Sequence, residues 1–423
     1  MDKRERRKKP NAQELFKRIG RNIRRNSFTP SLLRSFDWGL LILLLLIALF
    51  GVVCIFAATA SPLEQEEIDS MTFLEMIRSQ PTYYARLQLL WILAGLLCMA
   101  GIIYLDPKIF ERRANTIYWI NILMLVVVLF TGGGRSGMTG WFSWGRERTI
   151  QPSEFGKLAI IISLAKLFAS RNKHIMTVAE LLPTLAYVGL PLILIMMQPD
   201  VGTALVYIAV YGVMLFSSGT SYKLIVGILA LGVLMLVFVW YLMNVSESSF
   251  RLARIKVWLD PTYDPMGAGL QTANARIAVG SGGLWGKGLF SAGSFASLNY
   301  IPDDYTDFIF AIVCEAFGFV GAGLLILAFL LLIIRLFALS TQASDAFGSY
   351  VIVGVMAMFL FHIVENTGMV LGLLPVTGIP LPFISYGGSN ALTNFMGMGM
   401  VFSISARSRE ENKRGRERRP ARL

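Results

Sequence analysis

The chain has 423 residues, of which 55% are hydrophobic and 16% are charged, and its net charge is +12. Soluble domains carry about 25% charged residues, so this composition excludes an ordinary soluble protein. Many apolar runs reach the roughly 20 residues that a helix needs to cross a bilayer, and no alternation of period two indicates a β-barrel. We therefore expect an all-α, polytopic membrane protein.

The positive charge is concentrated at the two ends of the chain. Twelve of the 39 Lys and Arg residues precede Asp37, and eight follow Ala406. Basic tails of this kind are typical of cytoplasmic segments held by the positive-inside bias and by anionic lipid. We expect tails over 1–36 and 406–423, a membrane domain over 37–405, and no nucleic-acid partner. The first tail is either disordered or a short amphipathic helix on the inner leaflet.

Apolar segments predict about ten transmembrane helices. They cover approximately residues 38–59, 85–105, 115–131, 153–170, 178–197, 201–218, 222–244, 307–336, 347–372 and 381–405. An even number of spans returns the second basic tail to the side of the first. With both termini in the cytoplasm, the acidic loop 60–84 lies outside and the basic loop 106–114 lies inside, as the charge rule expects.

This orientation places the loop 132–151, the turn at 198–200, the long loop 245–306 and the turn at 373–382 outside. The long loop contradicts the charge rule, because it carries five basic residues, Arg251, Arg254, Lys256, Arg276 and Lys287. Binding of an anionic headgroup or a diphosphate would explain them. Alternatively, a loop of about 60 residues is translocated regardless of its charge.

Three aspartates lie where this loop meets the next apolar run, in the segment NYIPDDYTDFIF. They are Asp303, Asp304 and Asp307. A carboxylate inside the hydrocarbon costs roughly 2.5–3.5 kcal/mol on insertion scales, so an acid at this boundary suggests a functional site.

Two charged pairs inside the spans have helical spacing. Glu154 and Lys157 lie at i and i+3 after Pro152, which suits a first helical turn, so they form a structural ion pair or part of a functional site. His362 and Glu365 have the same spacing and form either a hydrogen-bonded pair or a proton relay.

Three further features remain. Asp200, in the turn QPD, is expected to cap a helix. Glu315 is eight residues after Asp307, so both are expected on one helical face. The glycine-rich segment 280–288 lacks the Walker A spacing, and its glycines favour close approach to a headgroup or a partner.

The residues alone support two classes of function. One is a transporter with a charged path through the membrane. The other is an enzyme that acts on a lipid-linked substrate at the outer leaflet, with a carboxylate as base and basic side chains holding a diphosphate.

Six motifs of the chain resemble the SEDS family (shape, elongation, division and sporulation), which includes the proteins of the RodA/FtsW/SpoVE type. They lie at 151–159 (QPSEFGKLA), 198–206 (QPDVGTALV), 260–271 (DPTYDPMGAGLQ), 280–288 (GSGGLWGKG), 305–321 (YTDFIFAIVCEAFGFVG) and 366–389 (NTGMVLGLLPVTGIPLPFISYGGS). They occur in family order, and their wording is most similar to the elongation branch, RodA. A division or sporulation role stays open.

The resemblance implies a peptidoglycan glycosyltransferase of the bacterial cytoplasmic membrane that polymerises lipid II into glycan strands. It implies Asp307 as the general base, and it places family acids at Glu154 and Asp200. The family has His two residues before the base, where this chain has Tyr305. It also implies a class B penicillin-binding protein, a transpeptidase, as partner.

The implied reaction needs a single base, because a lipid diphosphate is already a good leaving group. Attack by the acceptor hydroxyl from the opposite face inverts the anomeric carbon, and one base suffices, unlike hydrolysis, which uses a pair of carboxylates. The candidates for binding the substrate are Glu154, Lys157, Asp200, Arg254, Lys256, Arg276 and Lys287. A divalent cation, Mg or Mn, would serve as well, and Asp303 and Asp304 either help to hold it or are solvated acids.

Two alternatives follow from the same residues. A lipid II flippase would use Glu154, Lys157, His362 and Glu365 as its path. A scaffold would recruit other wall-synthesis proteins through the tails and outer loops and would tolerate the loss of Asp307.

Overall fold

The computed structural model describes residues 34–61, 63, 70–132, 140–144, 147–171, 174–228, 230, 232, 234, 250–260, 263–264, 267–291, 293–295, 298, 300–301 and 304–417. The expected amphipathic segment of the first tail, Asp303 and most of the predicted span 222–244 lie outside these residues.

The described part of the chain is helical apart from one two-stranded antiparallel ribbon. In chain order the elements are α3 (Trp38–Ala58), α5 (Phe73–Ser79), α6 (Tyr83–Tyr104), α7 (Pro107–Thr131), β1 (Phe142–Trp144), β2 (Glu147–Ile150), α8 (Pro152–Ala169), α9 (Val178–Met197), α10 (Val201–Ser217), α12 (Phe250–Leu259), α13 (Ala268–Ser281), α14 (Ile309–Thr341), α15 (Ala346–Val370) and α16 (Gly388–Glu417). The all-α prediction is confirmed.

Every predicted span except 222–244 coincides with one of these helices. Six described helices are long and apolar enough to cross a membrane, namely α3, α6, α7, α9, α14 and α15. Helices α8 and α10 are shorter, with 18 and 17 residues, and α8 carries charged side chains. The apolar runs of the sequence therefore located α8 and α10, which a criterion of helix length and absence of charge would miss.

Local capping explains where several helices begin. The Asp106 side chain accepts a hydrogen bond from Lys108 N, and Pro107 occupies the first helical position of α7. Asp345 caps α15 through Gly348 N at 2.7 Å. Because Asp106 caps it, α7 already begins at Pro107, inside the segment 106–114 that we expected to be a loop.

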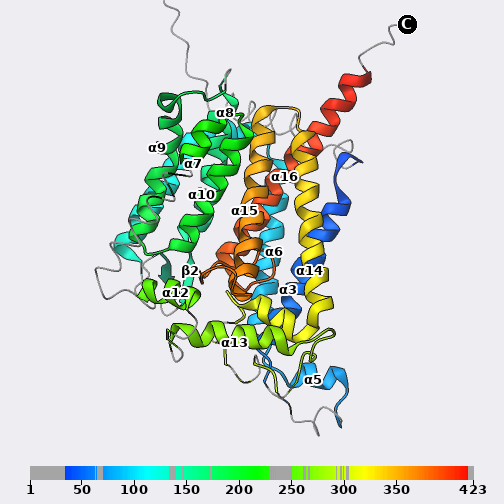
Figure 1. The fold of residues 1–423 in the computed structure, drawn as a ribbon. Helices are drawn as coiled ribbons and strands as arrows, with labels where there is room; N and C mark the ends of the chain where they lie inside the picture. The colour runs from blue at the N-terminus through cyan, green and yellow to red at the C-terminus, as the bar shows by residue number, and fades with distance from the viewer. Residues whose placement is uncertain are drawn as a thin grey trace, which may run out of the picture.

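The helices form one bundle with α15 near its centre (Figure 1). Helix α15 packs against α8, α10 and α14, and α16 packs along α6. Within its membrane-spanning window α15 is 67% buried, against 28–44% for the other five spans. Its side chains are therefore the ones most able to hold polar groups away from lipid.

The loops differ from expectation at both ends of the bundle. The long loop contains α12 and α13, which lie across one end of the bundle, as does α5 (Figure 1). At the opposite end α16 runs past Ala406, where we expected a basic tail to begin, and continues to Glu417.

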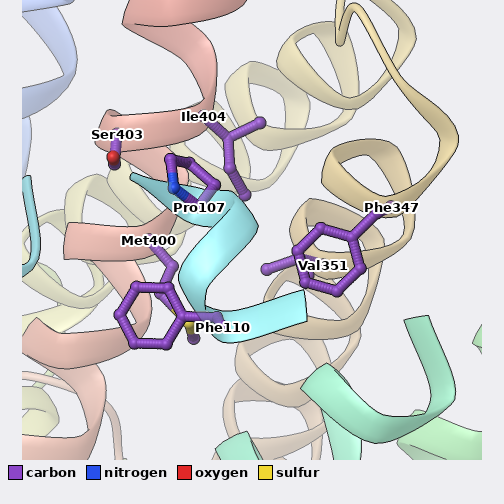
Figure 2. Close-up of a pocket in the computed structure, with 7 residues that line it drawn as sticks. All are labelled: Pro107, Phe110, Phe347, Val351, Met400, Ser403 and Ile404. Carbon is purple, nitrogen blue, oxygen red and sulfur yellow. The ribbon is translucent and has the colours of Figure 1, made fainter. Parts of the chain in front are cut away.

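A small apolar cavity lies where α7, α15 and α16 meet (Figure 2). Its lining comprises Pro107, Phe110, Phe347, Val351, Met400, Ser403 and Ile404, and its volume is about 10 Å³. This is the space of about one water molecule, so the cavity is a packing gap and not a substrate site.

Candidate functional site

The turn between α15 and α16 gathers the candidate residues from distant parts of the chain. Each residue from Val376 to Pro380 has a contact with another element. The contacts are Arg254 Nη1 to Val376 O (3.4 Å), Thr377 Oγ1 to Glu365 Oε1 (2.9 Å), Asp307 beside Gly378, Asn366 Nδ2 to Ile379 O (2.8 Å), and the His362 ring to Pro380 O (3.0 Å). We call residues 376–380 the central turn.

Asp307 lies against the middle of the central turn. Asn366 Nδ2 donates to the Asp307 carbonyl at 2.7 Å and to the Ile379 carbonyl at 2.8 Å, so one buried amide fastens both segments. Gly378 has a φ of +76°, and a Cβ at this position would be 3.2 Å from Asp307 Oδ2. The positive φ favours glycine at this position, and a Cβ would press on the carboxylate oxygen by a few tenths of an ångström.

Arg254 is the basic residue that the structure brings toward Asp307. It lies on α12, and its Nη1 donates to Val376 O at 3.4 Å. Burial lowers the pKa of the Arg254 guanidinium, and the Asp307 carboxylate acts in the opposite direction. The predicted base and one predicted cation therefore share one electrostatic environment at the central turn.

The other predicted cations of the long loop are placed differently. Arg276 on α13 reaches Gly372 O with Nη2 at 3.5 Å, and its buried Nε has no hydrogen-bond partner among the described residues. Lys256 donates to Tyr263 OH at 3.3 Å, on the exposed side of α12. Lys287 pairs with Glu315 at 2.8 Å, so it is part of an ion pair inside the loop structure.

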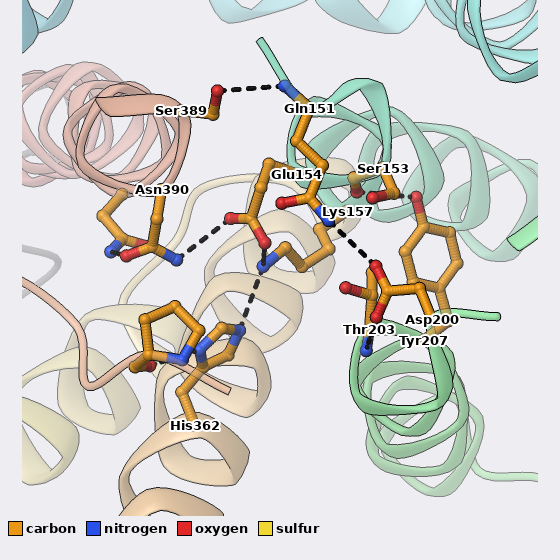
Figure 3. Close-up of polar contacts among 12 residues, drawn as sticks. Gln151, Ser153, Glu154, Lys157, Asp200, Thr203, Tyr207, His362, Ser389 and Asn390 are labelled. Carbon is orange, nitrogen blue, oxygen red and sulfur yellow. Dashed lines mark hydrogen bonds and ion pairs between the residues drawn. The ribbon is translucent and has the colours of Figure 1, made fainter. Parts of the chain in front are cut away.

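Glu154 and Lys157 form a buried ion pair at 2.7 Å, which confirms the pairing that their spacing predicted (Figure 3). Their side chains are only 5% and 1% exposed. Asn390 Nδ2 donates to Glu154 Oε2 at 2.9 Å, and Lys157 Nζ lies 3.1 Å from His362 Nε2. Pro380 O can only accept, so the ring donates through Nδ1 and Nε2 accepts from the ammonium.

This buried cluster is closed by the chain's own side chains, so neither Glu154 nor Lys157 is accessible to a substrate in this conformation. It is nevertheless joined to the central turn, because His362 bonds to Pro380 O. The cluster therefore supports the turn on which Asp307 lies.

Asp200 is an N-cap, as predicted. Its Oδ1 accepts from Thr203 N at 3.0 Å, and its Oδ2 accepts from Gln151 Nε2 at 2.9 Å (Figure 3). Gln151 N in turn donates to Ser389 Oγ at the start of α16. Asp200 thus ties the start of α10 to the start of α8, next to the buried cluster.

Two predicted relationships are wrong. His362 and Glu365 do not bond to each other: His362 contacts Lys157 and Pro380, whereas Glu365 accepts from Thr377. Asp307 and Glu315 do not share a helical face, because α14 begins only at Ile309. In the first case the central turn supplies nearer partners, and in the second case the helix does not extend back to Asp307.

Tyr305, where the family resemblance implies a histidine, packs among aromatic rings. It stacks on Tyr84 with centroids 4.7 Å apart and meets Tyr386 edge to face at 5.7 Å. Its carbonyl accepts from Tyr386 N at 2.9 Å. This side chain fastens the segment before α14 to α6 and to the start of α16.

Several residues of the site were not anticipated from the sequence. Asn366, Asn390 and Gln151 supply amide hydrogen bonds, and Gly378 supplies space for Asp307. A signal existed for Asn366, since an amide inside an apolar span needs a buried partner. For Asn390, Gln151 and Gly378, no pattern in the neighbouring sequence identifies the residue that each one contacts.

Among the described residues, no three His, Cys, Asp or Glu side chains group as metal ligands. A divalent cation held by one or two carboxylates would take its remaining ligands from water and from phosphate oxygens of a substrate.

Comparison with known proteins agrees with this architecture. The model of the FtsW/RodA/SpoVE family, described as cell cycle protein, matches residues 37–410. Stage V sporulation protein E of Bacillus subtilis is 35% identical over 378 residues, which cover 88% of this chain and 98% of that protein. Peptidoglycan glycosyltransferase MrdB of Escherichia coli is 35% identical over 314 residues, covering 74% of this chain and 83% of that protein.

A solved structure has the same fold. It is described as structural coordination of polymerization and crosslinking by a peptidoglycan synthase complex, and one of its chains matches with a TM-score of 0.71 and 27% identity. The match covers 88% of this chain and 98% of that chain. The present chain, a multi-pass protein of the bacterial cytoplasmic membrane, therefore belongs to the FtsW/RodA/SpoVE family of cell cycle proteins.

Proposed function

We propose that this chain is a peptidoglycan glycosyltransferase that polymerises lipid II, with Asp307 as the general base. The observation that carries the proposal is the placement of Asp307 at the central turn, beside Gly378 and within the electrostatic influence of Arg254. The name of the relative MrdB, peptidoglycan glycosyltransferase, supports the activity.

In the proposed reaction Asp307 removes the proton from a hydroxyl of the acceptor sugar. The oxygen attacks the anomeric carbon of the donor, the bond to the diphosphate oxygen breaks, and the configuration inverts. Arg254, a partly buried cation within the electrostatic influence of Asp307, attracts the leaving diphosphate as negative charge builds on it. Arg276, with its unpartnered Nε, is a second candidate for this role.

The substrate's lipid part has a matching surface nearby. An apolar groove of about 410 Å³ lies beside the first turns of α14, within the range of about 300–1,000 Å³ that ligand sites occupy. Its lining includes Phe310, three residues after Asp307, and Phe319 further along α14. A polar reaction at Asp307 next to an apolar groove suits a substrate that joins a diphosphate sugar to a hydrocarbon chain.

The test is polymerisation of fluorescent lipid II by the purified full-length protein. Asp307→Asn keeps the size of the side chain and removes the base, so we expect polymerisation to fall about 10²–10⁴-fold. Asp264→Asn is the matched control, because Asp264 lies in the same long loop and caps Gly267 N. Wild-type rates in Asp307→Asn would exclude Asp307 as the base.

Translocation is the second candidate function. It is favoured by the continuous contacts among Glu154, Lys157 and His362, although Glu365 does not extend them. Liposomes that contain the protein and labelled lipid II distinguish the two: translocation without polymer formation supports a flippase, and polymer formation supports the transferase.

We also propose that a class B penicillin-binding protein acts as partner. The matched peptidoglycan synthase complex combines polymerisation with cross-linking, and this sequence contains no motif for acyl transfer. Polymerisation assays with and without the transpeptidase, together with copurification, test this. The elongation role within the family stays a prediction from motif wording.

A further inference from the structure

Helix α14 is broken inside its first half. Gly318 has φ 65° and ψ −165°, which separates a short helix over 309–317 from the rest of the span. The loop 282–288, which belongs to the glycine-rich motif, fills the break with four backbone hydrogen bonds. They run from Lys287 N to Glu315 O (2.8 Å), Gly288 N to Ala316 O (3.1 Å), Phe319 N to Gly283 O (2.9 Å) and Val320 N to Leu284 O (3.1 Å). A membrane helix tolerates a break only where other groups satisfy its backbone.

The glycines of the motif allow this close approach. A Cβ on Gly282 would collide with the Cys314 carbonyl, and a Cβ on Gly286 would collide with the Ala316 carbonyl. Gly286 also has a φ of +84°. We had expected these glycines to admit a headgroup or partner; the group they admit is the backbone of α14 itself. We call loop 282–288 together with residues 315–320 the joint.

Glu315 fastens the joint with its side chain. The carboxylate is 2% exposed and accepts hydrogen bonds from three separate parts of the long loop. The donors are Lys287 Nζ at 2.8 Å, Phe295 N at 2.9 Å and Ser281 Oγ at 3.4 Å. The end of α13, the glycine-rich loop and the segment returning toward Asp307 are therefore held by one buried group.

The joint connects Asp307 with Arg276, the second candidate for attracting the diphosphate. Asp307 lies two residues before α14, at the far end of the short helix 309–317, and Arg276 lies on α13, which runs directly into loop 282–288. Since α14 is interrupted at Gly318, the direction of the short helix relative to the main span depends on the joint. A change at the joint would move Asp307 relative to the basic residues of the long loop.

We propose that the joint is a positioning element for glycosyl transfer and that Glu315 is its key positioning residue. This inference rests on the proposed function. Glu315 contacts no reacting atom; it holds the short helix so that the Asp307 carboxylate meets the acceptor hydroxyl. Misplacement of a catalytic group by about 1 Å can reduce a rate by about 10²-fold, so the joint need not move far to matter.

The test compares Glu315→Gln with the wild type in the lipid II polymerisation assay, using the full-length protein. Glutamine keeps the size of the side chain and can still accept from Phe295 N, but it loses the ion pair with Lys287. We expect kcat per folded protein to fall about 10–10²-fold, with KM within about twofold. The acid limb of the pH–rate profile should keep its midpoint, because Asp307 is still the base.

Lys287 offers a second variant in case Glu315→Gln does not fold, because its side chain is 25% exposed. Lys287→Met removes the pair from the loop side and should lower kcat in the same direction, whereas Lys287→Arg keeps the pair and most of the activity. Asp345→Ala, which removes a cap at the other end of the bundle, is the control. It should lower the melting temperature and leave kcat per folded protein at the wild-type value.

The outcomes separate this inference from the proposed function. If Glu315→Gln and Lys287→Met keep the wild-type kcat per folded protein while Asp307→Asn is inactive, the positioning role is wrong and the proposed function stands. If the wild type forms no polymer, or if Asp307→Asn is fully active, both are wrong. Loss of kcat in both joint variants with a normal kcat in Asp345→Ala supports the positioning role.

Discussion

The bundle interior and the central turn hold their charges in different ways. In the interior Glu154 and Lys157 pair directly at 2.7 Å, with Asn390 and His362 completing the cluster. At the central turn Arg254 donates to a neutral backbone carbonyl. The interior pair is closed off from solvent, so its charges serve the fold, whereas Arg254 and Asp307 at the turn are only partly buried and can meet a charged substrate.

The largest expected effect concerns the interior. Glu154→Gln leaves the Lys157 ammonium buried without its counter-ion, so we expect the free energy of unfolding to fall by roughly 3–5 kcal/mol. Thermal unfolding in detergent measures the change. The double variant Glu154→Gln/Lys157→Met removes both charges and should be closer to the wild type than either single variant. A Glu154→Gln protein that is fully stable and inactive would show instead that the cluster acts in the reaction.

A third group of charges, at the end of the bundle away from α13, extends the comparison. Asp37 caps α3 through Leu40 N and pairs with Arg335 and Arg409, each at 2.7 Å. Desolvation acts to raise the pKa of Asp37, but hydrogen bonds from Arg409, Leu40 N and Arg335 outweigh it and hold the pKa below its ordinary value of 3.8. Like the interior pair, this group should contribute to stability.

We expect Asp37→Ala to lower stability by about 1–2 kcal/mol, through the lost cap together with the two lost ion pairs, whose share is small because solvent screens the partly exposed arginines. A depressed folded-state pKa means that the stabilisation is present above pH 3.8 and is lost as the pH falls through the lower folded value. Unfolding of both proteins as a function of pH checks this. A difference that persists unchanged at the lowest pH would contradict an ionic origin.

A smaller effect of another kind is expected at the central turn. Arg254→Gln removes a charge that attracts the diphosphate, so we expect KM for lipid II to rise about tenfold, equivalent to about 1.4 kcal/mol, with stability unchanged. Lys256→Gln is the matched control on the same helix, since Lys256 contacts Tyr263 on the exposed side. Equal effects of both variants would mean that the long loop attracts the substrate only through its overall charge.

The smallest effect is expected for Tyr305→His, which introduces the residue that the family resemblance implies. Loss of stacking on Tyr84 should reduce stability by about 1 kcal/mol, while polymerisation should stay within about twofold. Thermal unfolding and the lipid II assay on the same preparation measure both. A large gain in rate would show that the imidazole assists Asp307 and that the tyrosine limits this chain.

The sequence predicted the helices well and the site in part. Apolar length located the spans, and the i, i+3 spacing predicted the pair of Glu154 with Lys157. The same spacing failed for His362 and Glu365, because the central turn supplies nearer partners to both. Spacing along the sequence identifies neighbouring side chains on one helix. It does not show whether a residue of another segment is a better hydrogen-bond partner for them.

The glycine-rich motif shows the same limit. Its spacing excluded a Walker A loop, and its glycines predicted close approach of the backbone to another group. The identity of that group, the broken backbone of α14, depends on contacts between residues far apart in the chain, such as Lys287 N with Glu315 O.

By itself, the sequence determined that the chain is a helical membrane protein, where most helices begin and end, and that Asp307 lies at the boundary of a span. These features follow from the cost of placing charge and unsatisfied backbone in hydrocarbon, which acts on each segment separately. Only the tertiary structure decided which segments meet at Asp307. Asn366 is 59 residues away from it, and Arg254 is 122 residues away from Val376. Such pairings arise from the packing of the whole bundle, which no local pattern encodes.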